Sequence, residues 1–101
     1  MALLIRVDGS VQAVEPADPA SGFTLEECYK HLETDMIEVV RLYRGPAEQR
    51  GGLIFIIDEE GKLKDKDANH CASIIAIQME AISIRDLIVG HAILCYSDEL
   101  R

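Results

Sequence analysis

The stretch Gly51-Gly52-Leu53-Ile54-Phe55-Ile56-Ile57-Asp58-Glu59-Glu60-Gly61 decides how this chain folds. Five consecutive apolar residues, 53–57, run from a pair of glycines into an acidic turn. A strand whose side chains are apolar on both faces is stable where both faces are covered and water has little access. The sequence therefore predicts that residues 53–57 form a central strand of a sheet, around which the core is built.

Length and composition set the scale of the fold. The chain has 101 residues, 49% of them hydrophobic, which predicts a single domain over residues 1–101 with a real core. Aromatic residues make up only 5% of the chain and tryptophan is absent, so the core is expected to be built from Ile, Leu and Val.

The net charge of −8 excludes several classes of partner. Residues 1–50 hold nine acids and five bases, and residues 51–101 hold the same numbers, so the negative charge is not gathered in a tail. A negative field repels phosphate groups. We therefore expect no direct binding of nucleic acid and no adhesion to an anionic membrane.

The chain carries no signal for export. Its apolar start at residues 1–5 has no basic segment before it and is too short for a signal peptide, and no apolar run is long enough to span a bilayer. Cys28, Cys71 and Cys95 are odd in number and widely spaced, which favours reduced thiols over a disulfide framework. These features predict a cytoplasmic protein.

The N-terminal half predicts a hairpin, a helix and a strand. Asp8-Gly9 lies between apolar runs, and both residues tolerate the positive φ of a tight turn. After a loop rich in proline, Thr24-Leu25-Glu26-Glu27 has the spacing of a capping box and predicts a helix to about Leu32. Residues 36–43 are rich in β-formers and predict a strand antiparallel to 53–57.

The C-terminal half is harder to assign. The apolar spacing predicts a second helix that opens at residues 65–67, with Asp65 or Asp67 as its cap. Residues 77–85 fit helix or strand, and we favour a helix to about Gln78 followed by an irregular segment. Residues 86–90 and 91–96 are expected to form one or two further strands.

The expected order is therefore β-β-α-β-β-α-β, with an eighth element if the last stretch makes two strands. We predict an α+β fold: a mostly antiparallel sheet of five or six strands with two helices packed on it.

Two clusters of charge are candidate contact residues for a protein partner. One is a sparse basic set around the loop before residue 53, and the other is the acidic turn after it; the residues are Arg41, Arg44, Arg50, Asp58, Glu59 and Glu60. The plainer interpretation is a solvated loop and a solvated turn, with Gly61 at a positive-φ position.

The usual signatures of chemistry are weak. The histidines and cysteines lack zinc-site spacing, and His91 with Cys95 shares only a strand face. Cys28 and His31 are helical neighbours without a visible oxyanion hole, so Cys28 is better explained as a core residue. We therefore assign no catalytic, cofactor-binding or metal-binding residue, and no cofactor.

The order of several segments resembles a family of small proteins known as domain of unknown function 3846. The resemblance spans nearly the whole chain and rests on Asp8-Gly9, Thr24–Glu27, Ile37–Leu42, Leu53–Leu63, Asn69 and Ile88–Leu94. Each motif alone is a generic turn or strand, and only their order is specific. The resemblance implies an origin in bacteria, phages or mobile elements, and it implies no catalytic or binding residue.

Three functions stay open from the sequence. The leading hypothesis is a non-enzymatic interaction or regulatory domain that binds a protein partner or itself. The second is an acidic mimic of nucleic acid that inhibits a defence or DNA-handling protein, which needs carboxylates ranked on one face. The third is a small hydrolase that uses the carboxylates of residues 58–60 or a histidine, which needs a pocket where they converge.

Overall fold

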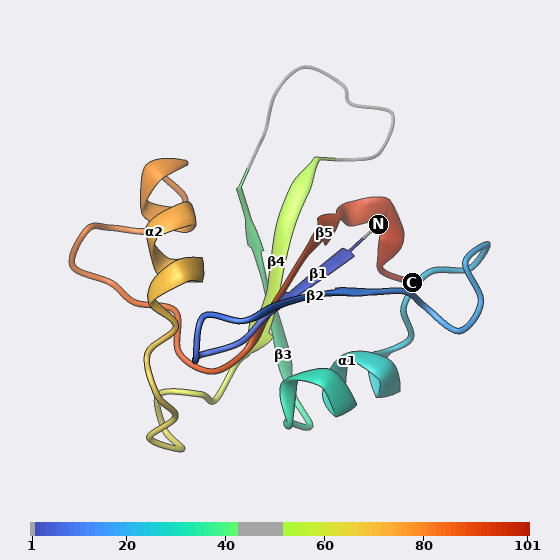
Figure 1. The fold of residues 1–101 in the computed structure, drawn as a ribbon, viewed down its shortest axis with the longest axis horizontal. Helices are drawn as coiled ribbons and strands as arrows, with labels where there is room; N and C mark the ends of the chain where they lie inside the picture. The colour runs from blue at the N-terminus through green and yellow to red at the C-terminus, as the bar shows by residue number, and fades with distance from the viewer. Residues whose placement is uncertain (1, 43–51) are drawn as a thin grey trace.

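The computed structural model describes residues 2–42 and 52–101, and these ranges form a five-stranded antiparallel sheet with two α-helices (Figure 1). The elements, in chain order, are β1 (Ala2–Ile5), β2 (Val11–Val14), α1 (Leu25–Leu32), β3 (Ile37–Arg41), β4 (Leu53–Asp58), α2 (His70–Gln78), β5 (Ala92–Tyr96) and the short 3₁₀ helix η1 (Ser97–Glu99). The predicted α+β class and the order of its elements are confirmed.

The apolar strand β4 lies inside the sheet. The strand order is β2-β1-β5-β4-β3, so β4 pairs with β5 on one side and with β3 on the other. Ile57 lies opposite Ala92 of β5 and opposite Glu38 of β3. The prediction of an interior strand is confirmed, although β5 rather than β4 occupies the middle and β4 runs one residue further, to Asp58.

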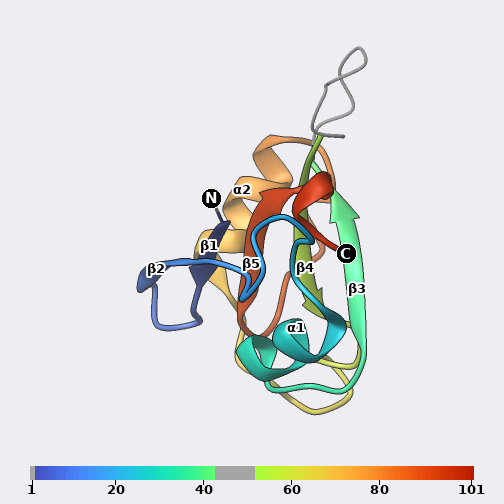
Figure 2. The same ribbon diagram turned by 90° about the vertical axis from the view of Figure 1, so that its right-hand side faces the viewer.

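The two helices cover opposite faces of the sheet, as the alternation of β4 requires. Ile54 and Ile56 belong to one buried cluster with Cys28 and Leu32 of α1. The intervening side chains Phe55 and Ile57 join a second cluster with residues of α2, among them Ala72 and Ala76. In Figure 1, α2 lies to the left of the sheet and α1 below it on the right; in Figure 2, α1 lies in front of the strands and α2 behind them.

The first helix begins where the capping box predicted. The Thr24 hydroxyl accepts a hydrogen bond from the Glu27 amide at 3.2 Å, and the Glu27 carboxylate accepts one from the Thr24 amide at 2.9 Å. These two bonds satisfy backbone donors that the first helical turn leaves unpaired. Phe23 and Cys28 flank the cap and are both fully buried in the same cluster, which fixes the chain on its way into α1.

The second helix begins later than predicted, and its cap is neither Asp65 nor Asp67. The cap is Asn69, which is fully buried and whose side-chain oxygen accepts a hydrogen bond from the Ala72 amide at 3.0 Å. The Asn69 side-chain amide donates to the carbonyls of Ile5 and Gly90, at 2.9 and 3.0 Å. An aspartate carries no such donor, which explains why an asparagine occupies this position.

The predicted strand at residues 86–90 is wrong. Those residues form a loop, in which Val89 makes only an isolated bridge with Ala68. The backbone groups of Ile88 are occupied by the start of α2: its carbonyl accepts from the Asn69 amide and its amide donates to the Ser73 hydroxyl, both at 2.8 Å. The expectation that α2 ends at Gln78 and gives way to an irregular segment is confirmed.

Candidate functional site

The acidic turn after β4 is anchored by Asp58. Its side chain is 1% exposed and lies 2.7 Å from the Lys66 ammonium and 3.2 Å from that of Lys64. The Thr34 hydroxyl and the Glu60 amide donate to its other oxygen, at 2.8 and 2.9 Å. Asp58 is therefore a buried structural junction, not part of the solvated turn that we expected.

The environment of Asp58 keeps its carboxylate ionised. Burial, the largest single influence, raises the pKa, but the hydrogen bonds from Lys66, Thr34, Glu60 and Lys64 together outweigh it and lower the pKa to about 2. Lys66 also donates to the carbonyls of Leu32 and Glu33, so the same ammonium closes the C-terminal end of α1. Asp58 therefore ties the end of α1 to the turn after β4.

The other members of the predicted contact set do not gather around Asp58. Glu59 is exposed and Glu60 half-buried on the turn. Arg41 is exposed at the far end of β3, where it pairs with Ile54 of β4. Asp58 pairs with Ile37 at the other end of β3, about 13 Å along the strand from Arg41. Arg44 and Arg50 lie outside the described residues.

Gly61 has a different role from the one that the sequence predicted. Its φ is not positive. A Cβ at this position would lie 2.7 Å from the Val89 side chain and 3.3 Å from the Val89 carbonyl. Gly61 is therefore required for close packing of the turn against the 86–90 loop.

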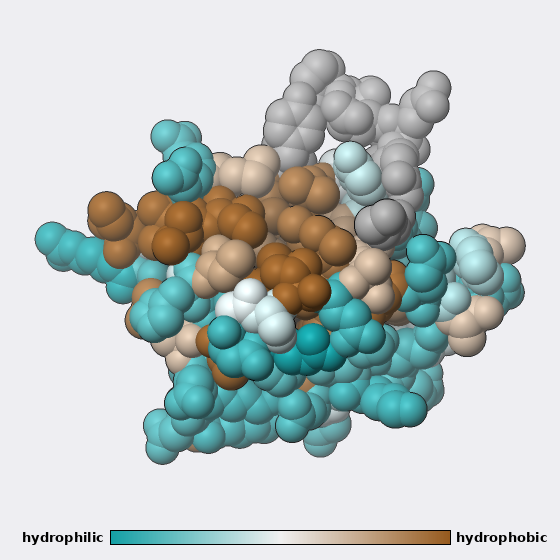
Figure 3. Space-filling model, viewed as in Figure 1, coloured by the Kyte–Doolittle hydropathy of each residue, from teal (hydrophilic) through white to brown (hydrophobic). Residues whose placement is uncertain are grey.

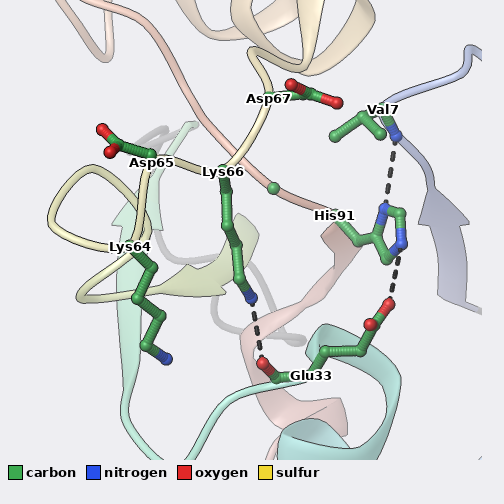
Figure 4. A pocket seen from close by; sticks show the side chains of 8 residues that line it. Val7, Glu33, Lys64, Asp65, Lys66, Asp67 and His91 are labelled. Atoms are coloured by element: carbon green, nitrogen blue, oxygen red, sulfur yellow. Dashed lines mark hydrogen bonds and ion pairs between the residues drawn. The ribbon is translucent and has the colours of Figure 1, made fainter.

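A pocket of about 340 Å³ opens where α1 ends and β5 begins (Figure 4). His91 lines one side of it: the Val7 amide donates to Nδ1 at 3.3 Å, and Nε2 lies 3.1 Å from the Glu33 carboxylate. The acceptor role of Nδ1 requires the neutral tautomer that carries its proton on Nε2. Figure 4 shows Asp65, Lys66 and Asp67 around the same space.

Three of the groups that line this pocket, Lys64, Lys66 and His91, make contacts within the fold. Lys66 and Lys64 are engaged by Asp58, and both ring nitrogens of His91 have partners. Across residues 2–42 and 52–101, no three His, Cys, Asp or Glu side chains are placed to hold a metal ion. The pocket therefore offers a hollow lined by acidic and basic side chains.

The cysteines separate into two kinds. Burial raises the pKa of the Cys28 thiol to about 11 and that of Cys95 to about 12, so both thiols are inert at neutral pH. The ring of His31, the helical neighbour of Cys28, packs edge-on against Phe23. Cys71, in contrast, is partly exposed on α2.

The carboxylates are used locally and in separate segments. Asp8 accepts from Ser10 in the β1–β2 turn, Asp18 from Ser21 in the following loop, and Asp86 pairs with Lys62. Glu27 is held in the capping box of α1. A mimic of nucleic acid needs carboxylates in a row on one face, whereas each of these four is engaged by a partner inside the fold.

The most distinctive surface lies over α2. This helix contains no Asp, Glu, Lys or Arg, and its isoleucines face more than one side. Its small residues Ala72, Ser73 and Ala76 are buried against the sheet, whereas Ile74 points outward with 58% of its surface exposed. On this outward face Ile74 lies between the exposed polar residues His70 and Gln78, each four residues away.

The sheet continues this apolar surface. Leu94 of β5 and Val40 of β3 lie opposite Phe55 of β4, so all three side chains share the α2 face. Phe55 is fully buried, but Leu94, Val40 and Leu53 are only partly covered. We name the α2 patch as the set of partly covered or exposed apolar residues on this face: Cys71, Ile74, Ile75, Met79, Ile82, Val40, Leu53 and Leu94. Figure 3 shows a continuous hydrophobic area over α2 and the neighbouring strands.

A sequence profile described as domain of unknown function, DUF3846, matches residues 1–100. The chain belongs to the DUF3846 family. No curated protein and no solved structure matches this DUF3846 protein. In the described ranges, 2–42 and 52–101, neither helix has the length and apolarity that crossing a bilayer requires.

The α2 patch was not among the predicted sites, although the sequence of α2 carries a signal for it. Residues 70–79 form a run of ten without Asp, Glu, Lys or Arg in a chain in which those four types make up 28% of residues. We interpreted its spacing as one buried face, whereas isoleucines at 74, 75 and 77 point to more than one side of a helix.

Proposed function

We propose that this DUF3846 protein is a non-enzymatic interaction module of the cytoplasm, and that it docks a protein partner through the α2 patch. The observation that carries the proposal is the outward face of α2, where Ile74 stands exposed on a helix without a charged residue. Contiguous exposed apolar surface on a small domain is typical of a binding site.

The character of the patch supports docking rather than catalysis. Interface cores are depleted of charged residues and enriched in methionine, and the patch has Met79 and no charged side chain. The partly exposed Cys71 lies within it. The cytoplasmic assignment is supported by the three free thiols, since a secreted domain of this size commonly relies on disulfides.

Site-specific photo-crosslinking in the native cell tests the proposal. A benzophenone amino acid at position 74 should give a discrete crosslinked protein product. The matched control places the same group at position 25, because Leu25 is a helical residue of similar exposure, 47%, on the other side of the molecule. Products at position 74 and not at 25 support the proposal, and their absence at 74, or equal products at both positions, contradicts it.

A further inference from the structure

We infer that the occupant of the α2 patch is a second copy of this chain, packed α2 against α2 about a two-fold axis. This inference rests on the proposed function and adds the identity of the partner.

The charge distribution points to this partner. Residues 70–79 of α2 and its C-cap and residues 92–96 of β5 contain no Asp, Glu, Lys or Arg, and Glu38, two residues before Val40 on β3, is an exposed acid on the same sheet face. A partner recognised by charge would need a complementary field there, and the patch presents none. An uncharged apolar surface instead complements itself, and interfaces between identical chains are the more apolar kind.

The border of the patch also suits a two-fold arrangement. Glu80 and Arg85, which are both exposed, lie on the segment that follows α2 and carry opposite signs. In a two-fold interface a residue of one copy meets a different residue of the other, so a border with both signs avoids facing like charges. A border with one sign would oppose pairing of identical copies.

Because the net charge is −8, the inference predicts how self-association depends on salt. Two like-charged copies repel, and salt screens that repulsion over about 8 Å at physiological ionic strength. Self-association through the patch should therefore strengthen as salt is added, because the repulsion weakens and the apolar contact remains. Docking of a basic protein on this acidic chain would weaken instead.

The experiment measures the mass of the protein by sedimentation over a concentration series up to about 100 μM, in about 0.05 M and about 0.5 M sodium chloride. We expect dimers whose dissociation constant falls as salt rises. Ile74→Glu should weaken the dimer at least about tenfold, because it buries a charge at the centre of the interface. Leu25→Glu changes the net charge equally on the other helix and should leave the dimer intact.

A second measurement follows Cys71 directly. Its reaction with a maleimide should slow as the wild-type concentration rises, and it should not slow in Ile74→Glu. Cys28 and Cys95 are buried and do not contribute to this signal. Circular dichroism of Ile74→Glu confirms that the variant is folded, and Ile74→Gln provides an uncharged alternative if it is not.

A wild-type protein that stays monomeric in both salts, or a dimer that Ile74→Glu and Leu25→Glu weaken equally, overturns the inference. The crosslinking at position 74 then separates this failure from failure of the proposed function. A product of another mass at position 74 means a different partner on the same patch, whereas no product means that the patch docks nothing.

Discussion

The two faces of the sheet are covered in different ways. On one face, Phe23 and α1 are packed over fully buried strand residues, and α1 is amphipathic, with charged Glu26 and Lys30 on its outer side. On the other face, α2 packs on the sheet through small buried residues, and Ile74 lies on its outer side. The first face exposes Leu25 and Val39, whereas the second exposes Ile74 beside the partly covered Leu53 and Leu94.

The two helices are also attached to the rest of the fold by different kinds of contact. The C-terminal end of α1 is held by an ionic network, Asp58 with Lys64 and Lys66. The start of α2 is held by neutral buried side chains, Asn69 and Ser73, which bond to the backbone of β1 and of the 86–90 loop. A helix fixed by buried neutral bonds keeps its position without needing charges near its outer surface, where α2 exposes His70, Ile74 and Gln78. The difference indicates that α2 holds an exposed apolar side chain, Ile74, in a fixed position, whereas α1 mainly covers its face of the sheet.

The largest expected effect comes from breaking the attachment of α2. Asn69→Ala removes the cap bond to Ala72 and leaves the buried carbonyls of Ile5 and Gly90 without their donor. We expect a loss of about 3 kcal/mol in the free energy of unfolding, measured by urea denaturation. The equivalent change at the cap of α1, Thr24→Ala, should cost only about 1 kcal/mol, because that cap is partly exposed.

Asn69→Ser separates the two roles of this residue. Serine keeps an acceptor for the first turn of α2 but carries no amide that can donate to both carbonyls. It should recover about 1 kcal/mol of the loss. Equal costs for Asn69→Ala and Thr24→Ala would show that the buried attachment of α2 adds nothing to an ordinary cap.

The second-largest effect is a loss of stability in acid, where the attachment of α1 through Asp58 is weakened. The hydrogen bonds around Asp58 lower its pKa from 3.8 to about 2 in the folded protein. Because the folded pKa lies below the unfolded value, the stabilisation is fully present above about pH 4 and disappears as the pH falls towards 2. A shift of this size corresponds to about 2 kcal/mol. The side chains that attach α2, Asn69 and Ser73, do not titrate.

Urea denaturation at several pH values between 7 and 2 measures this effect, with Asp58→Asn as the comparison. Other carboxylates with lowered pKa, such as Asp18 and Glu27, act in both proteins and cancel in the difference. The stability difference between wild type and Asp58→Asn should shrink by about 2 kcal/mol over this range. A constant difference would mean that the lysines do not hold Asp58 ionised.

Much of the fold follows from local patterns in the sequence. The doubly apolar run at residues 53–57, the Asp8-Gly9 turn and the capping box at Thr24 each occur where backbone geometry and side-chain type have one stable solution. The interior position of β4 and the start of α1 were therefore predictable before the structure.

The features that escaped prediction depend on contacts between segments distant in sequence. Asn69 is selected over Asp67 as a cap because its amide reaches Ile5, 64 residues away. Residues 86–90 have a strand-like composition, but their backbone bonds are taken by α2. In the sequence Asp58 belongs to a polar turn, and only the fold brings Lys64 and Lys66 into contact with it. The candidate surface needed the fold itself, because only the sheet register places Val40, Leu53 and Leu94 beside α2.

The smallest expected effect separates a surface from a core. Ile74→Glu and Leu25→Glu each replace an exposed apolar side chain on a helix by glutamate and change the net charge equally. At concentrations low enough to keep the protein monomeric, both should alter the free energy of unfolding by no more than about 0.5 kcal/mol, because glutamate is a good helix former and little buried contact is lost. Urea denaturation at low concentration measures both variants. If Ile74→Glu alone costs more than about 1 kcal/mol there, Ile74 belongs to the internal packing of the monomer, and the contrast between the two faces of the sheet is weaker than the structure indicates.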